Sequence, residues 1–214
     1  MNKDLSDYRK SYNKEELLLT NVPTNPLDLF QIWFELADKS NLIEEANAMT
    51  IATIGKDNYP KSRVVLLKNY SEKGFVFYTN YNSEKGKAIE NNNNVCISFF
   101  WPSLEKQIII KGKVTKVSEE ISKIYFQSRP KGSQLGAIVS NQSEEVSRQE
   151  LNDKLKVLEL EYKNKPIIKP KNWGGYIISP IEIEFWQGRP NRLHDRINYR
   201  LESNNQWKIK RLSP

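Results

Sequence analysis

The residues with the clearest chemical potential lie near the C-terminus, in Phe185–Arg196 (FWQGRPNRLHDR). We interpret this stretch as a hairpin whose first strand ends at Trp186 and whose second begins at Arg192. Side chains alternate along a strand, so Arg192, His194 and Arg196 are expected on one face. Guanidinium groups bind planar oxyanions in bidentate geometry, which suits an anion or an electron-rich ring. The alternative is a solvated basic strand edge, and anion-binding groups elsewhere in the chain must decide between the two.

Two further clusters carry cations. Arg63 and Lys68 bound an apolar strand and are five residues apart, which places their side chains on opposite faces and predicts two separate anion sites. Ser83, Lys85 and Lys87 open a short helix, and the free N–H groups of a helix start attract phosphate. A solvated helix end fits this second cluster equally well.

A third cluster, Tyr125–Gln134, combines a phenol, a guanidinium and hydroxyls around a chain reversal, which suits a phosphate monoester. Gln142 and Ser143 add neutral donors soon afterwards. Several small anion sites mixed with aromatic residues favour two phosphorylated small molecules over a polynucleotide, which usually requires one basic stripe or a known module. We therefore expect no nucleic-acid partner.

Composition limits the classes of protein that remain. The 214 residues fit one domain, and a net charge of +7 favours anionic partners. A single cysteine, Cys96, and a single histidine exclude a disulfide framework and predict no metal site. The N-terminus lacks an apolar signal region and no apolar run could span a bilayer, so a cytoplasmic protein without membrane contact is expected. Chemistry carried by a redox cofactor remains open.

The elements that position these residues are mostly strands joined by hairpins. Residues 1–25 form a polar N-terminal arm, and a helix begins at Pro26 with Asn25 as its cap. Ser118 and the Ser147–Glu150 capping box begin two later helices, and 132–140 is expected as a small-residue connection. Strands are predicted at 49–54, 62–68, 74–80, 95–101, 107–117, 173–179, 181–186, 192–201 and 207–212. The fold class is therefore α+β with an antiparallel, barrel-like sheet.

These motifs, taken together and in order, resemble the pyridoxine (pyridoxamine) 5′-phosphate oxidase family. The resemblance runs from about Tyr8 to Pro214 and rests on seven pieces: RVVLLK at 63–68, FYTN at 77–80, SRP with SQ at 128–134, NQS at 141–143, WGG at 173–175, FWQG at 185–188 and RLHDR at 192–196. It implies an FMN-binding antiparallel split β-barrel with flanking helices, here a single domain over 26–214. It also implies a homodimer with FMN at the subunit interface, which oxidises phosphorylated B6 vitamers at C4′ with O₂ to give pyridoxal 5′-phosphate.

The resemblance also implies roles for individual residues. Flavin-binding positions are matched by Arg63, Val64, Val65, Leu66, Leu67, Lys68, Tyr78, Thr79, Lys85, Gln107, Gln142, Ser143, Trp186 and Arg196. Substrate-binding positions are matched by Lys68, Tyr125, Arg129, Ser133, Arg192, Leu193 and His194, and by an arm that folds over the site, Arg9, Lys10, Ser11 and Tyr12. Arg192 and His194 match the catalytic residues that orient C4′ for hydride transfer to the flavin.

Two positions depart from the family pattern. Glu84 stands where an arginine usually lies beside the flavin phosphate, and the segment after Glu45 lacks a common proline. Three alternatives to the oxidase stay open at this point. They are a sister split-barrel flavin oxidase such as a phenazine-pathway enzyme, a non-catalytic carrier of FMN or pyridoxal phosphate, and, more distantly, a basic RNA-binding protein. Arg192, Leu193 and His194 argue against the first.

Overall fold

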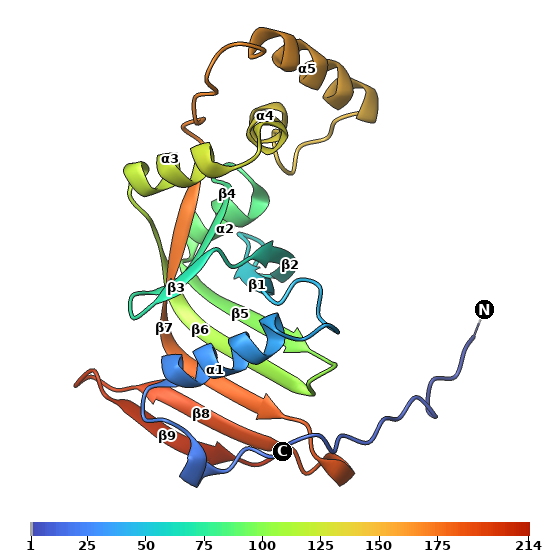
Figure 1. Ribbon diagram of the computed structural model, residues 1–214, viewed down its shortest axis with the longest axis vertical. Helices are drawn as coiled ribbons and strands as arrows, with labels where there is room; N and C mark the ends of the chain where they lie inside the picture. The colour runs from blue at the N-terminus through green and yellow to red at the C-terminus, as the bar shows by residue number, and fades with distance from the viewer. Residues whose placement is uncertain (1) are drawn as a thin grey trace. The chain divides into compact units, whose positions relative to one another are not determined.

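The structure is a computed structural model that describes residues 2–214 (Figure 1). Contacts divide the chain into two compact units, each built from separate stretches of sequence. Unit 1 comprises the chain up to Met49, Ile97–Lys111 and Pro180–Pro214. Unit 2 comprises Thr50–Cys96 and Gly112–Ser179.

Nine strands form an antiparallel split β-barrel with flanking helices, so the predicted α+β fold class is confirmed. Hydrogen bonding gives the order β2-β1-β5-β6-β7-β4-β3, and β8 pairs with β7 and β9. The strands are β1 (Ala48–Ile54), β2 (Pro60–Leu66), β3 (Asn69–Ser71), β4 (Gly74–Asn80), β5 (Asn94–Trp101), β6 (Lys106–Lys116), β7 (Trp173–Gln187), β8 (Asp195–Leu201) and β9 (Trp207–Leu212). The helices are α1 (Pro26–Asp38), α2 (Glu84–Asn91), α3 (Glu119–Ser128), α4 (Lys131–Val139) and α5 (Arg148–Glu161), with 3-10 turns η1 (Leu19–Asn21) and η2 (Pro190–Arg192).

Unit 1 is held together by an aromatic core between α1 and the sheet. The Asn25 side chain caps α1 by accepting from the Leu27 N–H, and Pro26 occupies the first turn, as predicted. The apolar face of α1 then places Phe30 against Phe99 of β5 and Trp33 against Phe185 of β7, with ring centroids 5.4 and 5.2 Å apart. These edge-to-face contacts fix α1 on the strands that lead to the C-terminal motif.

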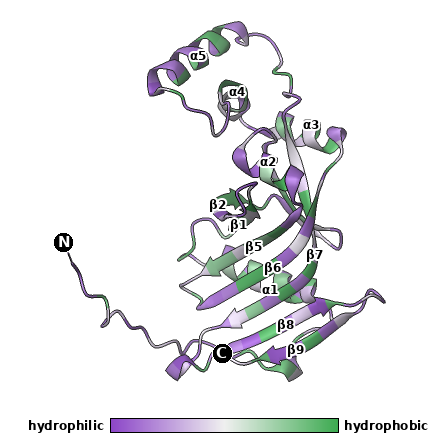
Figure 2. Cartoon of the chain, turned by 180° about the vertical axis from the view of Figure 1, so that it is seen from behind, coloured by the Kyte–Doolittle hydropathy of each residue, from purple (hydrophilic) through white to green (hydrophobic). Residues whose placement is uncertain are grey.

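Unit 2 combines β4 and the first half of β7 with the remaining helices. Ser83, Ser118 and Ser147 cap α2, α3 and α5 with their hydroxyls, as their sequence positions predict. Phe126 and Trp173 are the aromatic members of a buried cluster beside α4 and α5. Figure 2 shows α5 striped purple and green, and the partly buried Leu155 and Leu158 pack on this cluster.

Three predicted elements differ from the structure. The expected small-residue segment 132–140 lies almost entirely within a helix, α4 (Lys131–Val139), because small side chains leave helical geometry unhindered even though they resemble loop composition. The two strands predicted around Pro180 are one strand, β7. β7 pairs with β4 up to Ile178 and with β8 from Glu182, so Pro180 lies where these two ladders exchange and its missing N–H breaks neither register.

The C-terminal hairpin also differs. Its second strand begins at Asp195 rather than Arg192, and Trp186 pairs with Arg196. Asn191 and Arg192 have φ of 57° and 60°, a left-handed conformation that no strand can contain. The prediction that Arg192, His194 and Arg196 share one strand face is therefore wrong. Arg192 and His194 instead lie in the seven-residue loop 188–194 between β7 and β8. The dipeptide Pro190-Asn191 turns the chain there.

Candidate functional site

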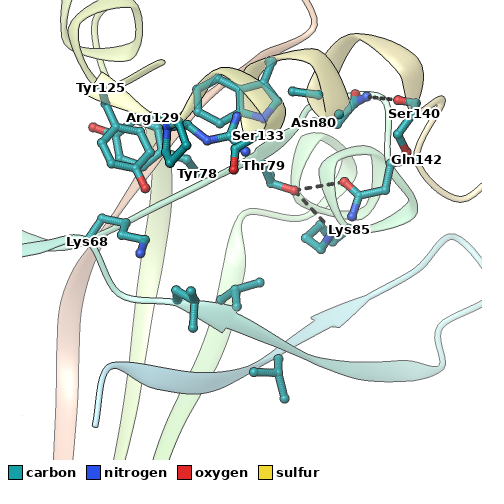
Figure 3. Close-up of a pocket in the computed structure, with 17 residues that line it drawn as sticks. Lys68, Tyr78, Thr79, Asn80, Lys85, Tyr125, Arg129, Ser133, Ser140 and Gln142 are labelled. Carbon is teal, nitrogen blue, oxygen red and sulfur yellow. Dashed lines mark hydrogen bonds between the residues drawn. The ribbon is translucent and has the colours of Figure 1, made fainter. Parts of the chain in front are cut away.

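The main cavity lies in unit 2 and has a volume of about 640 Å³ (Figure 3). This size lies within the usual range for small-molecule and cofactor sites. β2, β4, the start of α2, the α3–α4 segment and the start of β7 supply its walls. It is lined by Val64, Val65, Leu66, Lys68, Tyr78, Thr79, Asn80, Lys85, Tyr125, Arg129, Pro130, Ser133, Gly136, Ala137, Ser140, Gln142 and Trp173. We call it the main cavity below.

One end of the main cavity carries the features of an anion site. Arg129 and Ser133 lie there beside Tyr125, with Lys68 facing them from the end of β2 (Figure 3). The Arg129 guanidinium lies 4.7 Å from the Trp173 ring centroid, and one of its terminal nitrogens is buried without a hydrogen-bond partner. Burial lowers the pKa of Arg129, partly offset by Tyr125. A desolvated cation with an unused donor is stabilised by a bound oxyanion.

A stack of aromatic rings separates this end from the rest of the main cavity. The Tyr78 and Tyr125 ring centroids are 3.8 Å apart and nearly parallel, and Trp173 stacks on Tyr78 at 5.6 Å. Burial raises the pKa of both tyrosines, so both phenols stay protonated and can donate hydrogen bonds. The stack offers a flat surface with polar edges, which suits a planar heterocycle.

The other end of the main cavity is organised by a buried lysine from α2. Lys85 Nζ donates to Thr79 Oγ1 at 3.2 Å, and Thr79 in turn donates to Gln142 Oε1 at 3.3 Å (Figure 3). The Lys85 side chain is buried, and this desolvation, with the nearby charge of Arg63, lowers the pKa of its ammonium group. A second anion would relieve both effects.

Arg63 lies on β2 and lines a neighbouring cavity of about 180 Å³. Its guanidinium donates to Thr53 Oγ1 at 2.7 Å, and burial lowers its pKa. Arg63 and Lys68 thus line different cavities, but β2 ends at Leu66, so the expected strand 62–68 does not reach Lys68 and strand alternation does not explain the difference. Glu84, the residue that departs from the family pattern, also lines the smaller cavity and forms an ion pair with Lys61 at 2.6 Å.

The C-terminal motif lies in unit 1, where His194 contacts two aromatic rings. Its ring centroid lies 4.7 Å from that of Trp186 and 5.8 Å from that of Tyr12. The Arg189 backbone N–H donates to His194 Nδ1 at 3.0 Å, so the proton of the neutral ring is on Nε2. Burial, followed by the charge of Arg192, lowers the pKa of His194, which favours this neutral form.

The other predicted site residues of unit 1 lie along the same motif or on the arm. Arg196 forms a bidentate pair with Glu184, with N–O distances of 2.8 and 3.1 Å. Gln107 donates to Ser98 Oγ at 3.3 Å. In unit 1, the exposed members of the predicted set are Arg9, Lys10, Ser11, Arg192 and Leu193. These residues and the main cavity belong to different units.

Besides Arg63, two predicted residues of unit 2 do not line the main cavity. Leu67 is buried in the core, and Ser143 lines a third cavity of about 390 Å³. Conversely, the α4 face formed by Gly136, Ala137 and Ser140 lines the main cavity with Ser133 and escaped sequence reasoning. The missed signal is the spacing of these four small residues at i, i+3, i+4 and i+7, which is the period of one helix face.

Two classes of feature are missing from residues 2–214. These residues contain no group of three or more His, Cys, Asp or Glu side chains that could hold a metal ion. None of the helices described there is both long and apolar enough to cross a membrane.

Fold and site together define a class of protein: split-barrel proteins with a cationic cavity lined by stacked aromatic rings. The comparisons with known proteins give the family. Residues 39–164 match the family model described as pyridoxamine 5′-phosphate oxidase, and residues 173–214 match that of the pyridoxine 5′-phosphate oxidase C-terminal dimerisation region. The chain belongs to the pyridoxine/pyridoxamine 5′-phosphate oxidase family and is an oxidoreductase, so the resemblance read from the motifs is confirmed.

Individual relatives agree with this assignment. The chain is 62% identical over 213 residues to a pyridoxine/pyridoxamine 5′-phosphate oxidase of Flavobacterium psychrophilum, covering 99% of this chain and 100% of the relative. Among solved structures, PhzG from Burkholderia lata 383 in complex with tetrahydrophenazine-1-carboxylic acid has a TM-score of 0.86 at 27% identity, covering 94% of this chain and 100% of PhzG. A pyridoxamine 5′-phosphate oxidase-related, FMN binding protein from Nostoc punctiforme has the same fold, with a TM-score of 0.71 at 16% identity over 89% of this chain and 98% of that one.

Proposed function

We propose that this oxidase uses FMN to convert pyridoxamine 5′-phosphate or pyridoxine 5′-phosphate to pyridoxal 5′-phosphate, with O₂ as the electron acceptor. The substrate C4′ loses two electrons, O₂ gains them and leaves as H₂O₂, and the amine substrate also takes up water and releases ammonia. The observation that carries the proposal is the buried Arg129 nitrogen without a partner, at one end of a cavity whose other end holds buried Lys85. One charged end suits the substrate phosphate and the other suits the FMN phosphate.

The residues of the main cavity fit FMN. Lys85 is a buried cation whose hydrogen-bond partners are hydroxyls, and the Gln142 amide beside it can bind a polar ring edge. Apolar Val64, Val65 and Leu66 supply a wall for a planar ring. When bound, FMN supplies the acceptor for the two electrons that leave the substrate. The Nostoc punctiforme protein of the same fold is described as FMN binding, which supports this cofactor.

Each proposed substrate contact has a separate task. Arg129, Tyr125, Ser133 and Lys68 bind the phosphate and so fix one end of the substrate. Arg192 supplies a guanidinium over the ring, and neutral His194 donates from Nε2, so that C4′ is oriented toward the flavin. We infer that histidine contributes little acid–base catalysis. The Nδ1 of His194 already accepts a hydrogen bond, so the neutral ring can only donate, from Nε2.

We infer that the working form is a homodimer with FMN at the subunit interface. Residues 173–214 match a dimerisation region, and Arg192, His194 and Trp186 all lie within it. We also propose that residues 26–214 form a single FMN-binding domain preceded by the arm. We further propose a cytoplasmic location. Sedimentation of the FMN-loaded protein tests the dimer, and release of FMN on dissociation is expected.

The PhzG likeness makes a sister oxidase with a non-phosphorylated substrate the second candidate, because PhzG was solved with tetrahydrophenazine-1-carboxylic acid. Arg129 favours a phosphorylated substrate. The test is anaerobic addition of pyridoxamine 5′-phosphate to the FMN-loaded protein, followed by air. Bleaching of the flavin absorbance, and peroxide in the same amount as pyridoxal 5′-phosphate, are expected. Equal bleaching by unphosphorylated pyridoxamine would remove the phosphate assignment, and no bleaching would favour a carrier.

A further inference from the structure

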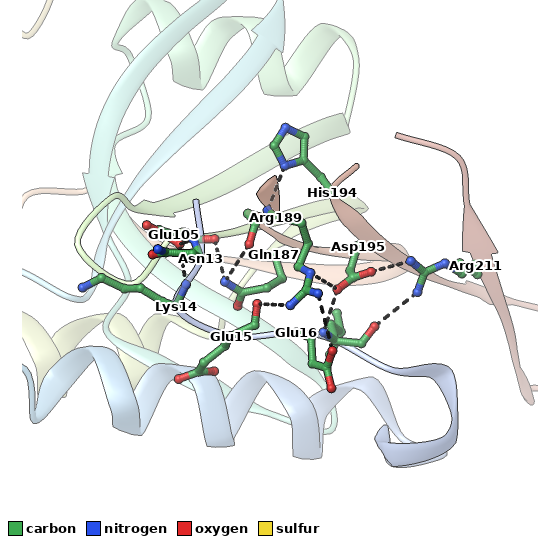
Figure 4. Close-up of polar contacts among 12 residues, drawn as sticks. Asn13, Lys14, Glu15, Glu16, Glu105, Gln187, Arg189, His194, Asp195 and Arg211 are labelled. Atoms are coloured by element: carbon green, nitrogen blue, oxygen red, sulfur yellow. Dashed lines mark hydrogen bonds and ion pairs between the residues drawn. The ribbon is translucent and has the colours of Figure 1, made fainter. Parts of the chain in front are cut away.

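The N-terminal arm is held along unit 1 by contacts to its backbone. Residues 13–17 run past the β5–β6 turn and the C-terminal motif (Figure 4). Their backbone N–H groups donate to two carboxylates, those of Glu105 and Asp195. We call these two residues the carboxylate clamp. Both are buried, with 1% and 4% of their surface exposed.

Glu105 holds the first part of this segment. Its Oε2 accepts from the Asn13 N–H at 2.9 Å and from the Lys14 N–H at 3.1 Å. Its own backbone has φ of 57°, which places the side chain under the arm, and its carbonyl accepts from the Gly188 N–H at 2.8 Å. Two donors on one buried carboxylate oxygen make a strong anchor, since hydrogen bonds to a charged acceptor exceed neutral ones.

Asp195 holds the second part. Its Oδ2 accepts from the Leu17 N–H at 2.9 Å, and its Oδ1 is paired with Arg211. Arg189 connects the clamp to the catalytic motif, because its guanidinium donates to the Glu15 carbonyl at 3.1 Å and its backbone N–H donates to His194. The arm and the histidine therefore share one support.

The clamp determines where Tyr12 lies. Tyr12 directly precedes the clamped residues, and its ring contacts Trp186 and His194 edge-on at centroid distances of 5.7 and 5.8 Å. A Cβ on Gly188 would lie 2.7 Å from Tyr12 Cγ, so the tyrosine packs directly on the backbone of the motif. The two N–H contacts to Glu105 are the backbone hydrogen bonds nearest to Tyr12 along the arm, and the Lys14 ammonium adds a side-chain hydrogen bond to the Ser103 carbonyl at 2.6 Å.

We propose that Glu105 is a positioning residue for the oxidase reaction: it holds the backbone at Asn13 and Lys14 and thereby places Tyr12 on His194 and Trp186. Asp195 is the second anchor of the same device. This inference rests on the proposed function only for its kinetic consequence. The exposed Lys10 ammonium also lies 3.8 Å from Glu105 Oε1, but the proposal rests on the backbone N–H groups of Asn13 and Lys14, which separates it from direct binding of substrate by Arg9 or Lys10.

The test uses three variants of the full-length, FMN-loaded protein. Glu105→Gly removes the carboxylate and tolerates the left-handed backbone without strain. Glu105→Gln keeps one carbonyl oxygen as acceptor and is the conservative variant. Asn13→Ala is the matched control, because it changes an exposed side chain and keeps the backbone N–H that donates to Glu105. Hydrogen exchange of the arm amides, and kcat and KM for pyridoxamine 5′-phosphate, are measured for each.

In Glu105→Gly, faster exchange at residues 13 and 14 is expected, with a KM raised on the order of tenfold and kcat changed by less than about threefold. Glu105→Gln should recover part of both effects, and Asn13→Ala should match the wild type. Unchanged exchange in Glu105→Gly, or faster exchange with an unchanged KM, would overturn the proposal. If Glu105→Gly loses protection at Phe185 and Ile197 as well, it has unfolded, and Glu105→Gln then decides by the same criteria. A wild type without turnover would refute the proposed function, while exchange still reports on the clamp.

Discussion

Replacing Glu84 with arginine should strengthen FMN binding by a modest, salt-sensitive factor. Glu84 lines the smaller cavity with Arg63, and the charges of both act on Lys85. Its carboxylate is paired with Lys61 at 2.6 Å, but the two side chains are 52% and 60% exposed. Solvent screening limits such a pair to about 0–1 kcal/mol. Glu84 therefore neutralises part of a cationic cluster at low cost, and removing it leaves Lys61 available to the phosphate.

The expected size follows from these terms. Losing a carboxylate and gaining a guanidinium near a phosphate changes two screened interactions, each worth about 1 kcal/mol or less, and about 1.4 kcal/mol is tenfold in affinity. Glu84→Arg should thus lower the FMN dissociation constant by about threefold to tenfold. The gain should disappear at about 1 M salt, where the Debye length is near 3 Å. Quenching of FMN fluorescence on titration into apoprotein measures both values.

Two controls separate local from general effects. Glu84→Gln removes the negative charge alone and should give about half of the gain in free energy. Glu159→Arg on exposed α5 makes the same change in net charge without lining any of the three cavities described, and should leave FMN affinity at the wild-type value. An equal gain in Glu159→Arg, or a gain that persists at high salt, would refute the local explanation.

Three further predictions concern the substrate and the histidine. Arg192→Ala should lower kcat/KM by about a hundredfold or more with FMN affinity unchanged, as steady-state kinetics and FMN titration will show. Arg129→Ala should weaken substrate binding by about tenfold to a hundredfold, the value of a charge-assisted contact, while unphosphorylated pyridoxamine is bound equally by variant and wild type. Burial and Arg192 lower the pKa of His194 below 6.5, so the unfolded chain binds this proton more tightly than the folded protein. Stability should therefore fall as pH drops below about 6.5, and thermal midpoints at about pH 5 and 8 should differ less in His194→Gln than in the wild type.

The sequence predicts much of this fold, because local rules set most of its elements. The caps at Asn25, Ser83, Ser118 and Ser147 each begin a helix where the side chain accepts a backbone N–H. β4 and β9 have the predicted bounds because a continuous apolar run in β4 and an apolar alternation in β9 each follow turn residues. α4 escaped prediction because glycine and serine carry no strong local preference, and only the cavity explains their helical spacing.

For the candidate site too, local sequence predicts some residues and misses those that depend on distant contacts. Residue types alone indicated anion binding at Lys68, Lys85 and Arg129, and the structure places all three in the main cavity. The clamp residue Glu105 lies in a hairpin turn, where a glutamate is usually a solvated end. Its role depends on an arm about 90 residues earlier in the chain, a contact that no local pattern encodes. No local pattern predicts the left-handed backbone of Arg192 either. Because of it, the strand begins at Asp195 and not at the expected Arg192.

Recognition of the arm through backbone N–H groups has a consequence for how this segment can change over evolutionary time. Every amino acid except proline presents the same donor, so mutations at Asn13 and Lys14 leave the hydrogen bonds to Glu105 in place. Selection on this contact acts on Glu105 and on the exclusion of proline, and the Lys14 side chain is constrained only through its separate hydrogen bond to the Ser103 carbonyl. Homologous arms can then diverge in sequence and still deliver the residue at position 12 to the same two rings.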